Sequence, residues 1–99
     1  MHNSTYSKRG YSLEKYENKS SMVTINMGEQ KTEGYSISIQ EIEIENYNVT
    51  INIIEYFPEE GKALTQALTY PYIQAYFDST PESLIVISSG TKEIFKEIK

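Results

Sequence analysis

The chain has 99 residues, a formal net charge of −5 and no cysteine. Its length is that of a single domain with one modest core, and the lack of thiols excludes disulfides, cysteine nucleophiles and thiolate metal sites. The acidic balance argues against nucleic acid as a partner, because a surface that binds phosphates is basic.

Alternating apolar residues predict strands in the first third of the chain. Residues 1–10 have no such periodicity, and we expect a flexible N-terminal tail followed by a single domain over residues 11–99. Residues 11–16 alternate weakly, which predicts a short edge strand. Residues 22–27 alternate clearly and predict a strand with one apolar face, whereas residues 28–34 predict a polar loop bracketed by two glycines.

The clearest strand is predicted for residues 36–45, although its apolar pattern changes parity halfway. The isoleucines in question are Ile37, Ile39, Ile42 and Ile44. The first two share one face of a regular strand and the last two share the other. A strand cannot change face without an extra residue, so we predict a β-bulge at residues 40–41 that turns all four isoleucines toward the core.

Residues 46–48 predict a hairpin turn, and residues 49–57 predict the return strand. Two further strands are predicted at residues 72–77 and 84–87. The last of these is a continuous apolar run, which is typical of a central strand covered on both faces.

The C-terminal residues permit two interpretations. Ile94, Phe95 and Ile98 have the spacing of a short helix that Thr91 would cap, but a strand stays open as the alternative. Together the elements predict an all-β fold, either an antiparallel β-sandwich or a small barrel, with six to seven strands and one or two short helical segments.

The 15 residues from 63 to 77 carry no charge, whereas Glu and Lys are frequent elsewhere. An uncharged segment of this length is normally buried or kept apolar as a contact surface. Its first part, residues 63–68, has apolar spacing that fits a loop or a single helical turn. No run is long and apolar enough to predict a membrane-spanning helix or a signal peptide.

The residues needed for catalysis are scarce. The only histidine, His2, lies in the predicted tail, and Glu43 and Glu45 alternate with isoleucines on the expected solvent face. No nucleophile elbow and no phosphate-binding loop is present. We therefore expect a protein that is not an enzyme and that needs no metal and no cofactor.

Tyrosine occurs nine times and tryptophan not at all. Tyrosine combines a rigid apolar ring with a hydroxyl group, which suits both the ends of a small core and a binding surface. Tyr35, Tyr70, Tyr72 and Tyr76 lie in or beside the 28–34 loop and the uncharged segment. Both roles stay open for them.

Two segments resemble the PrcB C-terminal domain family. Gly28-Glu29-Gln30-Lys31-Thr32-Glu33-Gly34-Tyr35-Ser36-Ile37 is similar to the family's Gly-Glu-x-Pro-Thr-Gly-Gly-Tyr-x-Ile motif, with Lys31 and Glu33 in place of the usual Pro and Gly. Thr65-Gln66-Ala67-Leu68-Thr69-Tyr70-Pro71-Tyr72 is similar to the second motif almost letter for letter. The resemblance covers residues 22–87. It implies a non-enzymatic bacterial domain, exported or at the cell surface, that assembles or stabilises a protease complex.

A fainter resemblance is to the chagasin-like inhibitors of cysteine proteases. Thr32, Gly34 and Tyr35 match the end of their Asn-Pro-Thr-Thr-Gly-Tyr loop, and residues 70–72 fall where their Arg-Pro-Trp loop would lie. This resemblance implies protease inhibition as the alternative function. A purely structural role, in a monomer or a homodimer, also stays open.

We therefore predict a protein-binding domain whose partner is another protein, with a protease suggested by both resemblances. The predicted partner-binding residues come from the two motifs: Thr32, Gly34, Tyr35, Thr65, Gln66, Thr69, Tyr70, Pro71 and Tyr72.

Overall fold

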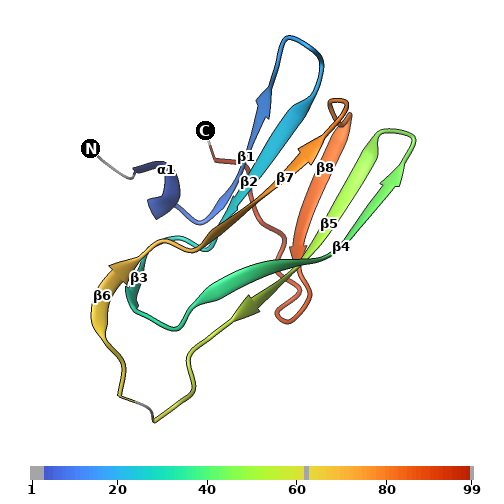
Figure 1. Cartoon of the computed structure of the whole chain (residues 1–99). Coiled ribbons are helices and arrows are strands. Elements are labelled where there is room, and N and C mark those ends of the chain that lie inside the picture. The colour runs from blue at the N-terminus through green and yellow to red at the C-terminus, as the bar shows by residue number, and fades with distance from the viewer. Residues whose placement is uncertain (1–3, 62, 99) are drawn as a thin grey trace.

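The computed structural model describes residues 4–61 and 63–98, and these form eight strands and one helical turn (Figure 1). The elements are α1 Ser4–Ser7, β1 Gly10–Lys15, β2 Ser21–Asn26, β3 Gln30–Thr32, β4 Ser36–Glu45, β5 Asn48–Tyr56, β6 Gln66–Thr69, β7 Tyr72–Phe77 and β8 Ser83–Ser88. They form three sheets, with strand orders β1-β2-β7, β4-β5-β8 and β3-β6. The predicted all-β, sandwich-like fold is confirmed, and the sheets do not close into a barrel. The described residues form eight strands instead of the expected six to seven, because β3 and β6 pair where no strand is predicted.

The first sheet is antiparallel and has β2 at its centre. Val23 of β2 lies between Leu13 of β1 and Ala75 of β7, and Ile25 lies between Tyr11 and Ile73. Val23 and Ile25 are fully buried. The strands predicted at residues 11–16, 22–27 and 72–77 are therefore confirmed, with β1 at the edge of this sheet.

The second sheet begins with the predicted hairpin. Asn46 and Tyr47 both have positive φ, 53° and 69°, and they join Glu45 directly to its partner Asn48. A two-residue turn with this geometry matches the twist of the strands that it connects.

The strand β8 is parallel to β5, not antiparallel as expected. The chain leaves the second sheet after β5 and passes through β7, and β7 and β8 then run in opposite directions (Figure 1). The prediction of a central strand is also wrong, because β8 is the last strand of its sheet. Its residue Ile85 is exposed, whereas Val86 is fully buried.

The predicted bulge is confirmed. Ile39 pairs with Ile53 but Glu41 pairs with Asn52, so Gln40 is the extra residue. The bulge places Ile42 and Ile44 on the same face as the buried side chains of β5. However, both remain exposed, so the expectation of four core isoleucines is wrong for this pair.

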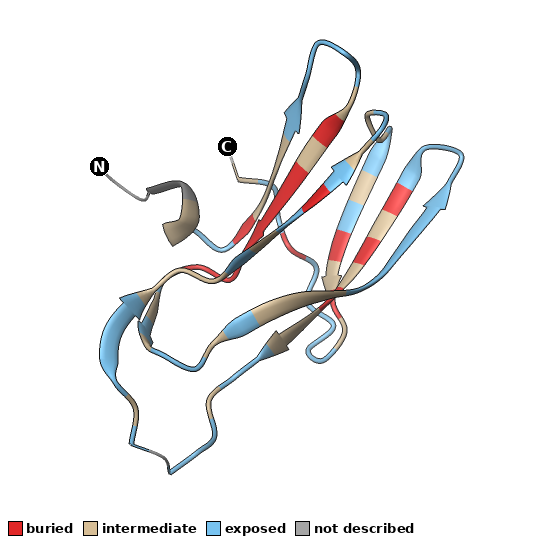
Figure 2. Ribbon diagram, viewed as in Figure 1, coloured by how far each residue is buried: buried red, intermediate tan, exposed pale blue. Residues whose placement is uncertain are grey.

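The core lies between the two three-stranded sheets, as the buried bands of β2, β5 and β8 indicate (Figure 2). Its buried side chains are Val23, Ile25, Val49, Ile51, Ile53, Val86 and Phe95. Phe95 belongs to the C-terminal segment, which is extended rather than helical. Its backbone N–H donates to the carbonyl oxygen of Val86 at 2.8 Å, and the N–H of Tyr11 donates to Lys96 at 3.0 Å. The segment therefore connects β8 to β1 along one side of the sandwich, and pairing with both strands excludes a helix.

Arg9 connects β5 to the C-terminal segment on this side of the molecule. Its guanidinium forms a bidentate ion pair with Glu55, at 2.7 and 2.9 Å, and donates to Glu93 at 2.7 and 3.2 Å. It also lies 4.4 Å above the Phe95 ring. The hydrogen bond to Glu55 raises the pKa of Arg9, with a smaller contribution from Glu93. Residues 1–3 of the expected tail lie outside the described residues, and the tail boundary stays a prediction.

The contact between Arg9 and Glu93 predicts a pH dependence of stability. Hydrogen bonds from Arg9 hold the pKa of Glu93 below its ordinary value of 4.5, so the unfolded chain binds more protons just below that pH. The stabilisation is complete above pH 4.5 and is lost as the pH falls through the folded pKa. We expect the Tm difference between wild type and Glu93→Gln to shrink from about pH 6 to about pH 3. Glu93 is 47% exposed, so the effect stays below about 1 kcal/mol. A Tm difference that does not change with pH would contradict this, and Glu60→Gln, at an exposed glutamate, is the control.

Candidate functional site

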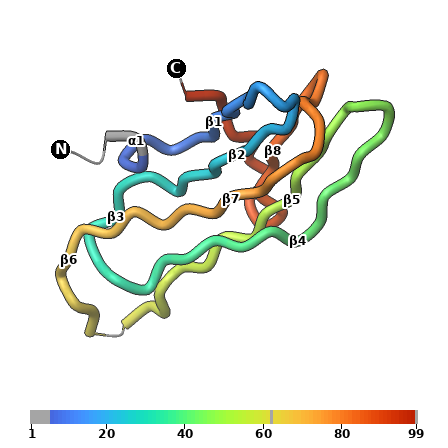
Figure 3. Tube along the Cα trace, turned by 45° about the horizontal axis from the view of Figure 1, so that its top comes forward, coloured from blue at the N-terminus to red at the C-terminus, as the bar shows by residue number. Residues whose placement is uncertain are grey.

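The uncharged segment begins in a two-stranded ribbon. The strands β3 and β6 pair Gln30 with Thr69 and Thr32 with Gln66, at the end of the molecule opposite to the β4–β5 turn (Figures 1 and 3). Of the loop and the single helical turn that are the alternatives for residues 63–68, the helical turn is wrong, because residues 63–65 are loop and residues 66–68 belong to β6. The loop expected at residues 28–34 is wrong for residues 30–32, which form β3. Beside the paired strands, the Glu33 N–H donates to the carbonyl oxygen of Thr65 at 3.2 Å, and the Thr69 hydroxyl donates to the Thr32 carbonyl at 3.0 Å.

Much of the ribbon faces solvent. Residues 65–68 are exposed, and Leu68 exposes 55% of its surface. Farther along, the uncharged segment becomes β7, where Ala75 is buried. The first part of this segment is therefore exposed, whereas Ala75 in its second part packs in the core.

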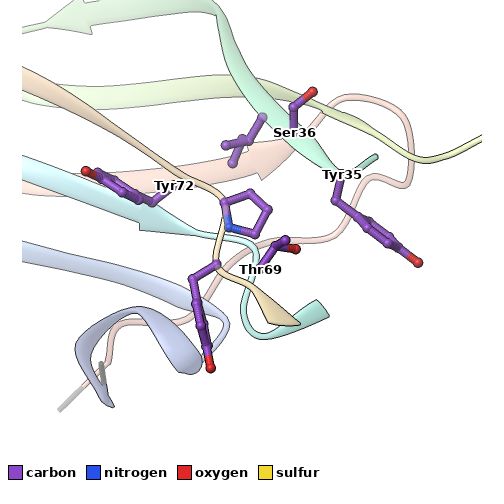
Figure 4. Close-up of a pocket in the computed structure, with 7 residues that line it drawn as sticks. Tyr35, Ser36, Thr69 and Tyr72 are labelled. Atoms are coloured by element: carbon purple, nitrogen blue, oxygen red, sulfur yellow. The ribbon is translucent and has the colours of Figure 1, made fainter. Parts of the chain in front are cut away.

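A cleft of about 390 Å³ lies where the two family-like motifs meet (Figure 4). Its walls come from β4, from the residue before it, and from the connection between β6 and β7. The lining residues are Tyr35, Ser36, Ile37, Thr69, Tyr70, Pro71 and Tyr72. None is charged. The cleft thus offers apolar rings and hydroxyl groups, a composition that suits the side chains and backbone of a protein ligand.

Tyr35 forms one end of the cleft. Gly34 precedes it with a φ of 100°, and a Cβ atom at Gly34 would lie 2.8 Å from the Cβ of Pro58. Only glycine fits this close approach without displacing Pro58. The Tyr35 ring packs edge-on against Phe57 at 6.0 Å, which fixes the half-buried ring in place.

Tyr72 forms the opposite end, and Figure 4 shows Thr69 between it and Tyr35. Tyr72 is 48% exposed, and its ring centroid lies 4.5 Å from that of Tyr6. The backbone between Thr69 and Tyr72 is held in place, because the Met27 N–H donates to the Pro71 carbonyl at 3.0 Å. Tyr70 is half-buried and its hydroxyl donates to Glu29 at 3.4 Å.

The predicted partner-binding residues therefore fall into two groups. Five of them line the cleft: Tyr35, Thr69, Tyr70, Pro71 and Tyr72. The other four lie in or beside the adjoining ribbon: Thr32, Gly34, Thr65 and Gln66. Sequence reasoning missed Ser36 and Ile37, which line the cleft directly after the first motif, and Phe57, which supports Tyr35. The only signal for Ser36 and Ile37 was their position at the end of the motif.

Two findings concern the described residues alone. In the ranges 4–61 and 63–98, no group of three His, Asp or Glu side chains is placed to hold a metal ion. Within the same ranges, no helix has the length and apolar character needed to cross a membrane.

The family model described as PrcB C-terminal matches residues 21–77, more than half of the chain. The match begins at the first residue of β2 and ends at the last residue of β7, so it includes the ribbon, both motifs and the whole lining of the cleft. Searches among curated proteins and among solved structures gave no significant match. The chain belongs to the PrcB C-terminal family.

Proposed function

We propose that this protein is a non-enzymatic accessory or stabilising subunit of a bacterial protease complex, exported or held at the cell surface, and that it binds its partner through the cleft and the ribbon. The family membership supports the protease context. The contact surface is supported by the way in which two motifs, residues 28–37 and 65–72, meet in one uncharged cleft.

The exposure of aromatic and aliphatic side chains is the observation that carries the proposal. Tyr72 lines the cleft, Phe57 packs against Tyr35 and Leu68 lies in the adjoining ribbon, and each exposes about half of its surface. A monomer gains nothing from leaving large apolar side chains in water, whereas a partner that covers them gains their burial. Tyrosine is also among the residues that contribute most to binding energy at interfaces.

Tyr72→Ala is the variant that tests this surface. We expect it to weaken partner binding at least about tenfold, as the loss of an interface anchor does, while the domain stays folded because Tyr72 is half exposed. Tyr76→Ala is the matched control, because Tyr76 lies on the same face of β7, is 72% exposed and does not line the cleft. Affinity purification from envelope and cytosolic fractions, read by mass spectrometry, identifies the partner. Titration of the purified partner then gives the affinities.

Two outcomes decide whether the cleft is the contact surface. A partner that is lost with Tyr72→Ala but kept with Tyr76→Ala supports the cleft as the contact surface. Equal binding by both variants and wild type would refute it.

Protease inhibition is the second candidate, because Gly34-Tyr35 and Tyr70-Pro71-Tyr72 adjoin at the cleft as two inhibitory loops would. Adding the domain to the purified protease distinguishes the two roles. A stabilising subunit prolongs the activity of the protease, whereas an inhibitor lowers its initial rate.

A further inference from the structure

The second half of β4 is a free edge at the other end of the strand from the cleft. We call residues 41–45 the β4 edge. In the part of the chain that the structure describes, β4 pairs with β5 on one side and with no strand on the other. An unpaired edge presents backbone N–H and C=O groups that can pair with an added strand.

The inner face of the β4 edge is apolar but uncovered. Ile42 and Ile44 lie directly opposite Ile51 and Val49, which are buried in the core. Nevertheless, Ile42 is 37% exposed and Ile44 is 62% exposed. This end of β4 appears as a continuous exposed band in Figure 2, beside the buried band of β5. A strand added to the edge would place its own inward side chains against these isoleucines.

The outer face of the β4 edge is acidic. Glu41, Glu43 and Glu45 alternate with the isoleucines, and none of the three forms an ion pair with another described residue. A hollow of about 550 Å³ lies beside them, lined by Glu43, Ile44, Glu45, Asn48 and Thr50. This hollow has carboxylate and amide groups, and no basic side chain lines it.

The negative charges of the β4 edge indicate which kind of strand can pair with it. If two copies of this chain paired their β4 edges with the isoleucines on a common face, their glutamates would meet on the opposite face. Like charges opposite one another destabilise a strand pair. A strand in which Lys or Arg alternates with apolar residues would place its apolar side chains against the isoleucines and its basic side chains beside the glutamates.

We propose that the β4 edge accepts, by strand addition, an extended segment of another protein in which basic and apolar residues alternate. The apolar side chains of that segment cover Ile42 and Ile44, and its basic side chains pair with Glu43 and Glu45 beside the hollow. This surface is separate from the cleft, so the proposal does not depend on the function assigned to the cleft.

The test uses a capped peptide of about nine residues, the length of a typical longer strand, with alternating Lys and Val. A second peptide with Glu in place of Lys is its control. In ¹⁵N NMR titrations of the whole chain, we expect micromolar binding of the Lys peptide, with shifted and exchange-protected amides at residues 41–45. The Glu peptide should not bind.

Two charge variants separate the edge from the net charge of the protein. Glu43→Lys/Glu45→Lys should weaken binding of the Lys peptide at least about tenfold and create binding of the Glu peptide. Glu17→Lys/Glu60→Lys changes the net charge equally at two exposed sites elsewhere, and it should keep the affinity within about threefold. Ile44→Thr should weaken binding about threefold or more without any change in charge.

Several results would overturn the proposal. Equal loss of binding in both charge variants would mean a general attraction to an acidic protein. Amide shifts away from residues 41–45, or no binding of the Lys peptide at about 1 mM, would remove the β4 edge as a site. A wild-type dimer in sedimentation that Glu43→Lys/Glu45→Lys alters would make a second copy the occupant.

Discussion

Replacing Arg9 with Met should lower the free energy of unfolding by about 3 kcal/mol. The carboxylate of Glu55 is only 1% exposed and receives two hydrogen bonds from Arg9. Without the guanidinium, its remaining donor in the described structure is the hydroxyl of Ser88, at 2.9 Å. An unpaired buried charge is strongly destabilising, and the methionine replaces the apolar stem of Arg9 but not its charge. Urea unfolding followed by circular dichroism measures the change.

Two further variants control this result. Lys31→Met removes the exposed ion pair with Glu29, in which Lys31 is 79% exposed, and should cost less than about 0.5 kcal/mol. Arg9→Met/Glu55→Gln removes the buried charge as well and should recover part of the loss. If Arg9→Met destabilised the domain no more than Lys31→Met does, the interaction would not have the structural role that its geometry indicates.

Ile51→Ala should destabilise the domain by about 3 to 4 kcal/mol. Ile51 is fully buried in β5, the central strand of its sheet, and its neighbours across the strands are Ile42 and Val86. Its truncation leaves a cavity between β-sheets whose hydrogen-bonded strands cannot move in to fill it. The measurement is the denaturant midpoint at an unchanged m-value.

Ile44→Ala is the matched control for Ile51→Ala. Ile44 lies on the same face of the same sheet, but 62% of its surface is exposed. Its truncation should cost less than about 1 kcal/mol, because little apolar surface returns to water. Equal losses for the two variants would mean that Ile44 is covered in solution, for example by a second copy of the chain.

The bounds of the family match allow stability and partner binding to be tested with different variants. The match ends at β7, whereas Arg9 and Glu93 lie outside residues 21–77. Arg9→Met therefore tests whether contacts between the matched region and the residues outside it stabilise the sandwich, and Tyr72→Ala tests the cleft within the matched region. If Arg9→Met keeps partner binding and Tyr72→Ala loses it, the cleft is needed for binding and the Arg9 contacts are needed only for stability.

Local patterns in the sequence were sufficient for most of the strands. The alternation in residues 22–27 places Val23 and Ile25 on one face because side chains alternate along any strand. The change of parity between Ile39 and Ile42 predicted the bulge at Gln40 for the same reason. Five residues of the two motifs, Tyr35 and residues 69–72, line the cleft, and their role in partner binding stays a prediction.

The conformation of two segments was decided by the tertiary structure. The segment 63–68 fits a loop or a helical turn in isolation, but Thr65 accepts a hydrogen bond from Glu33 and Gln66 pairs with Thr32 of β3. The C-terminal residues have helical spacing, yet their backbone pairs with β8 and β1. In both cases long-range backbone hydrogen bonds outweigh a weak local preference.

The same holds for Arg9 and for the isoleucines of the β4 edge. Arg9 looks like part of a polar tail, because its partners Glu55 and Glu93 are 46 and 84 residues away. Ile42 and Ile44 look like core residues, because alternation shows which face of a sheet they occupy but not whether another layer covers that face. The sequence by itself determined six of the eight strands in the described residues, all except β3 and β6, because their alternation depends on neighbouring residues. Only the packing of the sheets decided which strands pair, which sheet faces are covered and where the cleft lies, because these features depend on residues that are distant in the chain.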